Sequence, residues 1–162
     1  MKLFNRPKTK GERVAEIILI SLIFLNLAFI YVNSALPPDL SGESSGRVAA
    51  IIRALLPEGN PLGDFLVTNI RKLAHFFEYG SLGALVSIYL SVFSPRPRIT
   101  VPVSILSGFI AAFIDETLQI FSGRGPMIAD VWLDLFGYVT LTLIVCLAAA
   151  IIKSINRKKH CN

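Results

Sequence analysis

The sequence predicts an all-α fold, an integral membrane bundle of four transmembrane helices. Its 162 residues are 53% hydrophobic and 17% charged, whereas a soluble domain carries about a quarter charged residues. Four stretches of roughly 20 or more residues are nearly uncharged, long enough to cross about 30 Å of hydrocarbon. Nothing alternates as in a membrane β-strand. The composition excludes a soluble enzyme core, a disordered chain and a disulfide scaffold.

The predicted spans are Ile17–Leu36, Leu73–Val92, Thr100–Phe121 and Ile128–Ile152. The first apolar run is too long for a cleaved signal peptide, so we interpret it as a retained anchor. The spans form one domain over residues 17–152, between basic tails at residues 1–16 and 153–162. Cys146 lies in the last span and Cys161 in the tail, which does not predict a disulfide.

Basic residues set the predicted orientation, because Lys and Arg near span ends stay in the cytoplasm. They gather in the first tail, in the short second connection around Arg96 and Arg98, and in the last tail. In a four-span chain these segments lie on one side, so we expect both termini to be cytoplasmic. Most acidic residues fall on the other side. The net charge of +5 is then a topogenic signal and an attraction to anionic lipid, and it predicts no nucleic-acid partner.

The outer loop, residues 37–72, is the one long connection expected. It opens with a Ser/Gly-rich turn, Ser41–Gly46, which predicts a flexible segment. Apolar residues at helical spacing predict a short helix over Arg47–Leu56. We expect it to lie flat in the membrane interface, with a lid over a site as the alternative. Phe65–Lys72 is predicted to lead helically into the second span.

Polar side chains enter three of the spans near one membrane face. They are Lys72, His75, Glu78 and Tyr79 in the second span, Asp115, Glu116 and Gln119 in the third, and Asp130 and Asp134 in the fourth. With a rise of about 1.5 Å per residue, all lie within about 10 Å of the outer interface. Arg124 lies in the short turn between the third and fourth spans. Ionisable groups in a span face a partner or a cavity, so these residues predict one shared outer-leaflet site. The uncharged inner halves predict no path through the membrane.

Carboxylates outnumber cations in this predicted site, since only Lys72, Arg124 and Arg71 are near. Close carboxylates in a low dielectric cannot all be ionised, so either one is protonated or a cation lies among them. His75 and Glu78, spaced i and i+3, could each supply a ligand, and oxygen-rich surroundings favour Mg²⁺ or Ca²⁺ over zinc. No familiar metal motif is present. We therefore predict no cofactor, with a divalent cation as an open alternative.

A purely structural role is the other interpretation of these polar groups. Arg124 could pair with Asp115 or Asp130 and fasten the third span to the fourth. His75 could hydrogen-bond a carboxylate across a helix interface.

Other residues of the spans have simpler expected roles. Tyr79 and Trp132, near the interface, are expected to be aromatic anchors more than ligands. Gly80, Gly83 and Gly108 are expected where helices approach one another closely.

The polar residues also carry a resemblance. Lys72-x-x-His75-Phe76-x-x-Tyr79 resembles the first signature of VanZ-like membrane proteins, and Asp115-Glu116-x-x-Gln119-x-Phe121-x-x-Arg124, followed by Asp130 and Gly137, resembles the second. The resemblance covers roughly Pro37–Ile152. The family commonly has Asn where this chain has Asp134, so a role inherited at that position is in doubt.

The resemblance implies a multi-pass protein of the bacterial cytoplasmic membrane. The family's namesake is linked to resistance to teicoplanin, a lipoglycopeptide antibiotic that binds cell-wall precursors. No biochemical activity is attached to the family, so the resemblance implies a location in the cell envelope and not a mechanism.

Three classes of function follow. The first binds or remodels an envelope lipid, a lipid-linked precursor or a lipoglycopeptide, with Lys72 and Arg124 contacting its phosphate or carboxylate. The second is an intramembrane hydrolase with catalytic candidates Glu116, Asp115 and His75. The third is a structural or regulatory membrane partner. A transporter is disfavoured because no inverted repeat and no midplane site is visible.

Overall fold

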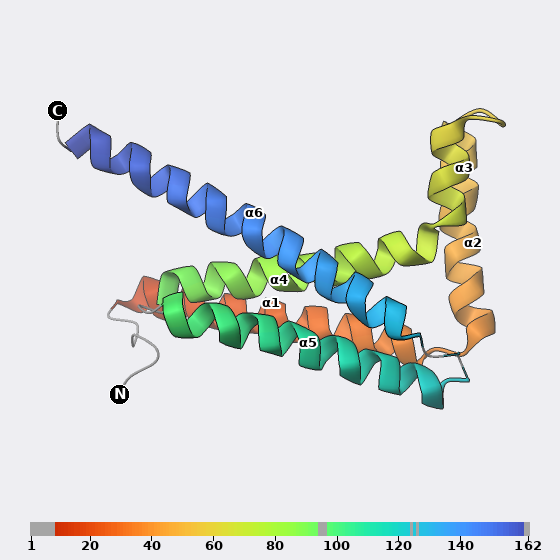
Figure 1. The fold of residues 1–162 in the computed structure, drawn as a ribbon, viewed down its shortest axis with the longest axis horizontal. Helices are drawn as coiled ribbons and strands as arrows, with labels where there is room; N and C mark the ends of the chain where they lie inside the picture. Colours follow the sequence, from red (N-terminus) through yellow and green to blue (C-terminus); the bar gives the residue numbers. More distant parts are fainter. Residues whose placement is uncertain (1–8, 94–96, 124, 126, 161–162) are drawn as a thin grey trace.

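The computed structural model describes residues 9–93, 97–123, 125 and 127–160 (Figure 1). These residues form helices and connecting turns, with no strand among them. The helices are α1 (Lys10–Ala35), α2 (Pro38–Leu55), α3 (Pro61–Thr68), α4 (Ile70–Phe93), α5 (Pro97–Phe121) and α6 (Ile128–His160).

Four of the described helices, α1, α4, α5 and α6, are long and apolar enough to cross a membrane. Their apolar lengths are Lys10–Ala35, Ile70–Phe93, Val101–Phe121 and Ile128–Ile152. The four-span prediction is therefore confirmed, and the predicted bounds differ mainly at the start of α1. That helix begins earlier because Thr9 and Glu12 form a capping box at its first turn.

The bundle has two unlike ends (Figure 1). In the view of Figure 1, α1, α4 and α5 run side by side, while α6 crosses α4 and then diverges from the bundle. Helices α2 and α3 stand across the end where α1 ends, α4 begins, α5 ends and α6 begins; we call this the site end. Helix α1 begins and α6 ends at the opposite end. The described chain thus begins and finishes on the same side of the bundle, and the cytoplasmic assignment of that side stays a prediction.

Glycines bring α4 and α6 together closely. A Cβ on Gly83 would overlap the backbone carbonyl of Tyr138, and a Cβ on Gly137 would overlap that of Phe76. A Cβ on Gly108 of α5 would meet the ring of Tyr138 at 2.9 Å. The expected close approach is confirmed, because only a residue without a side chain lets the backbones come this near.

Tyr79 belongs to the core of the bundle, and its expected place among interfacial anchors is wrong. It is 0% exposed, and its hydroxyl donates a hydrogen bond to the backbone oxygen of Ala111 on α5, at 3.2 Å. A tyrosine can be buried in this way because its polar tip finds a partner. Trp132, by contrast, is 60% exposed on the outside of α6.

The predicted flexible turn at Ser41–Gly46 is wrong, because α2 is helical from Pro38 onward. Pro38 occupies the first helical turn, where its missing N–H costs nothing. The hydroxyls of Ser44 and Ser45 bond carbonyl oxygens four residues earlier, and Arg47 pairs with Glu43 at 2.6 Å. The serine hydroxyls are thus accommodated within the helix, although the composition of this segment alone favours a turn. The residues predicted to lead into the second span form α3 and the start of α4, separated at Asn69.

Candidate functional site

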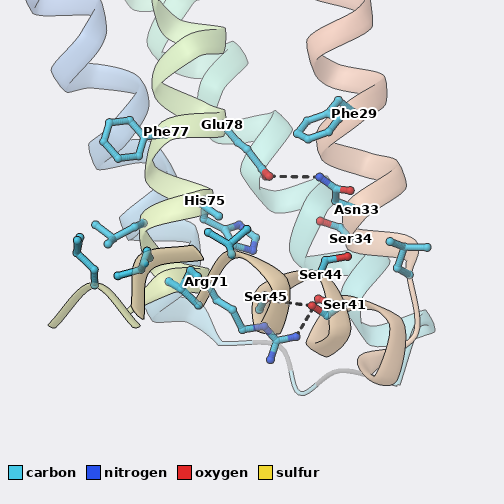
Figure 2. A pocket seen from close by; sticks show the side chains of 17 residues that line it. Phe29, Asn33, Ser34, Ser41, Ser44, Ser45, Arg71, His75, Phe77 and Glu78 are labelled. Carbon is cyan, nitrogen blue, oxygen red and sulfur yellow. Dashed lines mark hydrogen bonds between the residues drawn. The ribbon is translucent and has the colours of Figure 1, made fainter. Parts of the chain in front are cut away.

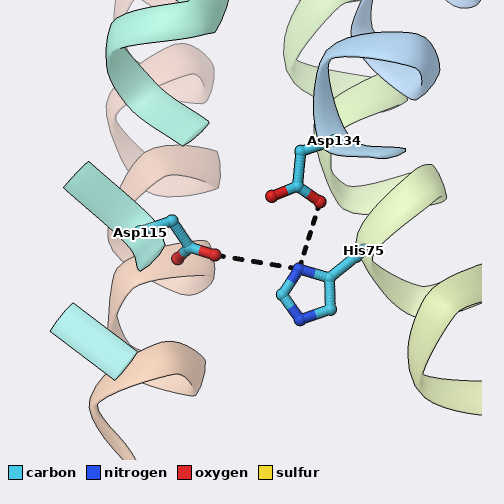
Figure 3. Close-up of side chains that lie close together, drawn as sticks. All are labelled: His75, Asp115 and Asp134. Atoms are coloured by element: carbon cyan, nitrogen blue, oxygen red, sulfur yellow. Dashed lines mark ion pairs between the residues drawn. The ribbon is translucent and has the colours of Figure 1, made fainter. Parts of the chain in front are cut away.

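The centre of the site lies where three helices meet at the site end. His75 comes from the first turns of α4, Asp115 from the last turns of α5 and Asp134 from the second turn of α6 (Figure 3). The imidazole Nδ1 of His75 lies 3.2 Å from Oδ1 of Asp134 and 3.7 Å from Oδ2 of Asp115. The three residues, separated widely in the sequence, therefore form one compact group, which we call the His–Asp–Asp cluster.

The two aspartates are more deeply buried than the histidine. The side chains of Asp115 and Asp134 are 0% exposed, whereas that of His75 is 22% exposed. Within the described part of the chain, Oδ2 of Asp134 accepts no hydrogen bond. Figure 3 shows the second ring nitrogen of His75 directed away from both carboxylates. His75 therefore contacts the two buried aspartates with one ring nitrogen, while another part of its side chain remains accessible.

Glu116 and Gln119 form a second layer beside the cluster. Gln119 donates to Oδ2 of Asp115 at 3.2 Å and to Oε1 of Glu116 at 3.1 Å. The other oxygen of Glu116 accepts the backbone N–H of Met127 at 3.0 Å. Both carboxylate oxygens of Glu116 thus have partners, and the residue ties the end of α5 to the start of α6.

Glu78 faces α1 instead of the cluster. Its Oε1 accepts a hydrogen bond from the amide of Asn33 at 3.3 Å. The predicted pairing of His75 and Glu78 as metal ligands therefore differs from the geometry, which brings Asp115 and Asp134 to His75. Asp130 is half-buried one turn before Asp134.

A cavity of about 550 Å³ lies between α1, α2, α3 and α4 (Figure 2). Its apolar lining includes Phe29 and Phe77, which are 57% and 64% exposed on the outside of the bundle. Its polar lining is Asn33, Ser34, Ser41, Ser44, Ser45, Arg71, His75 and Glu78. One end of the cavity has the two phenylalanines and the Asn33–Glu78 hydrogen bond, and the other has Arg71 and Ser41 (Figure 2). A second cavity of about 360 Å³ lies between Pro38, Gln119, Met127 and Asp130, and it too is lined by His75 and Arg71.

The described site contains the cationic side chain of Arg71, and not that of its neighbour Lys72. Both residues are exposed, but Lys72 lines neither of these two cavities, whereas Arg71 lines both and donates to the hydroxyl of Ser41 at 3.1 Å. Arg124, the other predicted cation, lies outside the described residues. Of the predicted site residues, the structure brings together His75, Asp115, Glu116, Gln119, Asp130 and Asp134. It places Glu78 in the main cavity, facing α1, and Tyr79 in the adjoining core.

Sequence reasoning missed the contributions of α1 and α2. Asn33 and Ser41 line the main cavity, yet neither was a candidate. The polar Asn33 within an apolar span is a usable signal, because an amide there needs a partner. Ser41 carries no such signal, since its place depends on how α2 stands over the bundle.

These features define a multi-pass helical membrane protein with a polar site between its helices at one end of the bundle. The chain belongs to the VanZ/LLP1 family, whose family model matches residues 14–149. No curated protein and no solved structure matches the chain.

Proposed function

We propose that this protein binds a phosphate-bearing amphiphile of the bacterial cell envelope, a membrane lipid or a lipid-linked cell-wall precursor, at the outer leaflet of the cytoplasmic membrane. The observation that carries the proposal is the main cavity, which joins an end with the exposed side chains of Phe29 and Phe77 to an end with Arg71 (Figure 2). Its volume of about 550 Å³ falls in the range of small-molecule sites.

The two ends of the cavity suit the two parts of such a ligand. An acyl or prenyl chain would lie against the exposed phenylalanines, where it exchanges one apolar environment for another. The headgroup would meet Arg71, whose guanidinium forms paired hydrogen bonds with phosphate oxygens. Ser41 already holds that side chain at 3.1 Å, which lowers the entropy lost when a ligand binds.

The family supports a ligand of this class. Its namesake is linked to teicoplanin resistance, and a lipoglycopeptide likewise combines an acyl chain with a polar head. Either the precursor that such antibiotics bind or the antibiotic itself would suit a cavity with these two ends.

The hydrolase alternative has less support in the geometry. Glu116 has hydrogen-bond partners on both oxygens and lines neither described cavity. A general base must reach the proton that it removes. Among the three catalytic candidates of the hydrolase hypothesis, the residue that can contact a ligand in these cavities is His75.

The test compares two adjacent basic residues, Arg71 and Lys72, in one binding assay. Fluorescent phosphatidylglycerol is titrated into the detergent-purified protein, the Arg71→Ala variant and the Lys72→Ala variant. A charge-assisted hydrogen bond contributes about 1.5–3 kcal/mol, so we expect Arg71→Ala to weaken binding roughly tenfold or more. Lys72→Ala, which removes the same charge from a neighbouring residue that lines neither cavity, should change affinity less than about twofold.

Competitors then separate the possible ligands. Undecaprenyl phosphate, unlabelled phosphatidylglycerol and teicoplanin are each added to the bound probe, with zwitterionic phosphatidylcholine as the control. Displacement by one phosphate lipid at the lowest concentration names the class. Equal weakening by Arg71→Ala and Lys72→Ala would mean a general surface attraction and would contradict the proposal. Mass spectra of the recovered probe report any cleavage, which would favour the hydrolase.

A further inference from the structure

The His–Asp–Asp cluster has the separations of a metal site. Metal bonds of about 2.0–2.2 Å place two ligands of a tetrahedral ion roughly 3.4 Å apart. The two distances from Nδ1 of His75, 3.2 Å and 3.7 Å, lie on either side of that value. One ligand atom from each residue can be chosen so that all three lie within 4.8 Å of one another. An ion between the two carboxylates would draw them together, since attraction to it replaces their mutual repulsion.

Asp134 supplies an independent observation. Its side chain is 0% exposed, and no described residue donates a hydrogen bond to its Oδ2. A buried carboxylate oxygen without a donor costs free energy unless a cation or a proton satisfies it. The carboxylate is aimed at His75 and the space beside it (Figure 3). Asp134 thus presents a buried oxygen to which a cation could bind.

We propose that His75 Nδ1, Asp115 and Asp134 bind one divalent transition-metal ion, Zn²⁺ or Mn²⁺. Imidazole nitrogen favours transition ions over Mg²⁺ and Ca²⁺, while the two carboxylates suit Mn²⁺ and are common in zinc sites. A divalent charge also balances two ionised carboxylates beside a neutral imidazole. The ligand set differs from the His75 and Glu78 pair that the sequence suggests, because Glu78 bonds Asn33.

The site does not rest on the lipid proposal. Its ligands line the interior between α4, α5 and α6, and only His75 among them reaches the cavities. Metal binding can be measured without any lipid probe, so the failure of one proposal leaves the other standing.

The experiment uses Mn²⁺ as the probe on the chelator-treated, detergent-purified chain. Loss of the free-ion electron paramagnetic resonance signal gives the number of ions bound, and Zn²⁺ is added as a competitor. We expect one ion per chain, displaced by Zn²⁺. Asp134→Asn should weaken binding by at least about tenfold, since changing even a residue that only supports a ligand costs that much. Asp64→Asn, which neutralises an exposed carboxylate of α3 that lines neither cavity, should bind as the wild type does.

A pulsed measurement identifies the nitrogen ligand. The sequence holds two histidines, His75 and His160, so each serves as the control for the other. Nitrogen modulation from bound Mn²⁺ should persist in His160→Ala and disappear in His75→Ala. The nitrogen modulation is measured in the wild type and in His160→Ala, which keep both aspartates. The result therefore stands even if an aspartate variant fails to fold.

Three results would overturn the proposal. The first is a wild-type protein that binds neither Mn²⁺ nor Zn²⁺. The second is an Asp134→Asn protein that binds the ion as tightly as the wild type does. The third is a nitrogen signal that persists in His75→Ala. A detergent-stable Asp134→Asn protein that loses the ion, with Asp64→Asn retaining it, would support the site.

Discussion

Glu116 shows how one buried acid can hold two helices at a fixed separation. Its two oxygens accept hydrogen bonds from Gln119 on its own helix and from the backbone of Met127 just before α6. The same bonds fix Gln119, which also donates to Asp115. The position of one acid of the His–Asp–Asp cluster therefore depends on a residue outside it.

We expect Glu116→Ala to loosen the turn between α5 and α6. The Met127 N–H loses a charged acceptor, a bond of about 1.5–3 kcal/mol. Amide exchange over residues 122–128, measured by mass spectrometry, should accelerate by roughly tenfold or more. Thr117→Ala is the control, because the Thr117 hydroxyl bonds Phe113 within its own helix. Similar exchange in the two variants would assign the turn's stability to other contacts.

Single residues also mark the limit of what the sequence can predict. His75, Asp115 and Asp134 are predictable, since costly polar groups at one depth on three helices must meet. The choice of Arg71 over Lys72 is not predictable. The two are adjacent, about 100° apart around a helix, and which one faces the cavity depends on where α2 lies.

The pairing of α4 with α6 is the closest helix contact that the glycines reveal. Gly83 approaches the backbone of Tyr138, and the hydroxyl of Thr142 donates to the Gly83 carbonyl at 3.2 Å. Tyr138 in turn places its ring over Gly108 of α5, with its hydroxyl 2.9 Å from that of Ser104. One residue of α6 thus contacts both neighbouring helices and fixes the spacing that the cluster needs.

Gly83→Ala should destabilise the bundle. Its methyl group would overlap a backbone carbonyl, which cannot rotate away, and overpacking of this kind costs about 1–3 kcal/mol. The apparent melting temperature in detergent should fall. Gly46→Ala on α2 is the matched change, since its methyl group meets nothing within 4 Å. Replacing glycine in an exposed helix stabilises by about 0.5–1 kcal/mol. A Gly83→Ala protein as stable as the wild type would contradict the close contact.

Helices α2 and α3 show where composition misleads. Serine and glycine favour turns in isolation, but in α2 the serine hydroxyls bond carbonyls one turn earlier and so do not compete for the backbone N–H groups, and an ion pair one turn apart supports the helix. The four spans are predictable from length and hydropathy because the bilayer imposes them. No such constraint acts on a loop helix, so its length depends on local bonds and on the helices beneath it.

The whole molecule is polarised along its length. The polar cluster, both cavities and helices α2 and α3 lie at the site end, and the described chain begins and ends at the other. Lys10 and Arg13, in the first turns of α1 at the far end, agree with an orientation that places the site outside the cytoplasm.

Labelling of intact cells tests this orientation. In a Cys146→Ser, Cys161→Ser background, Glu58→Cys, in the exposed turn between α2 and α3, should react with a membrane-impermeant maleimide. A variant that keeps only the native Cys161 should react after the membrane is permeabilised and not before. The reverse pattern would place the site end in the cytoplasm and would contradict the outer-leaflet proposal.

The exposed phenylalanines that line the main cavity have a consequence for how the affinity of the proposed lipid ligand must be counted. Phe29 and Phe77 both line the cavity and are 57% and 64% exposed. Under the proposed function, a lipid reaches them by lateral diffusion within the membrane and never crosses water. Occupancy then depends on the mole fraction of that lipid in the membrane. A site with a weak affinity, when expressed as a concentration in solution, can therefore be fully occupied in the membrane.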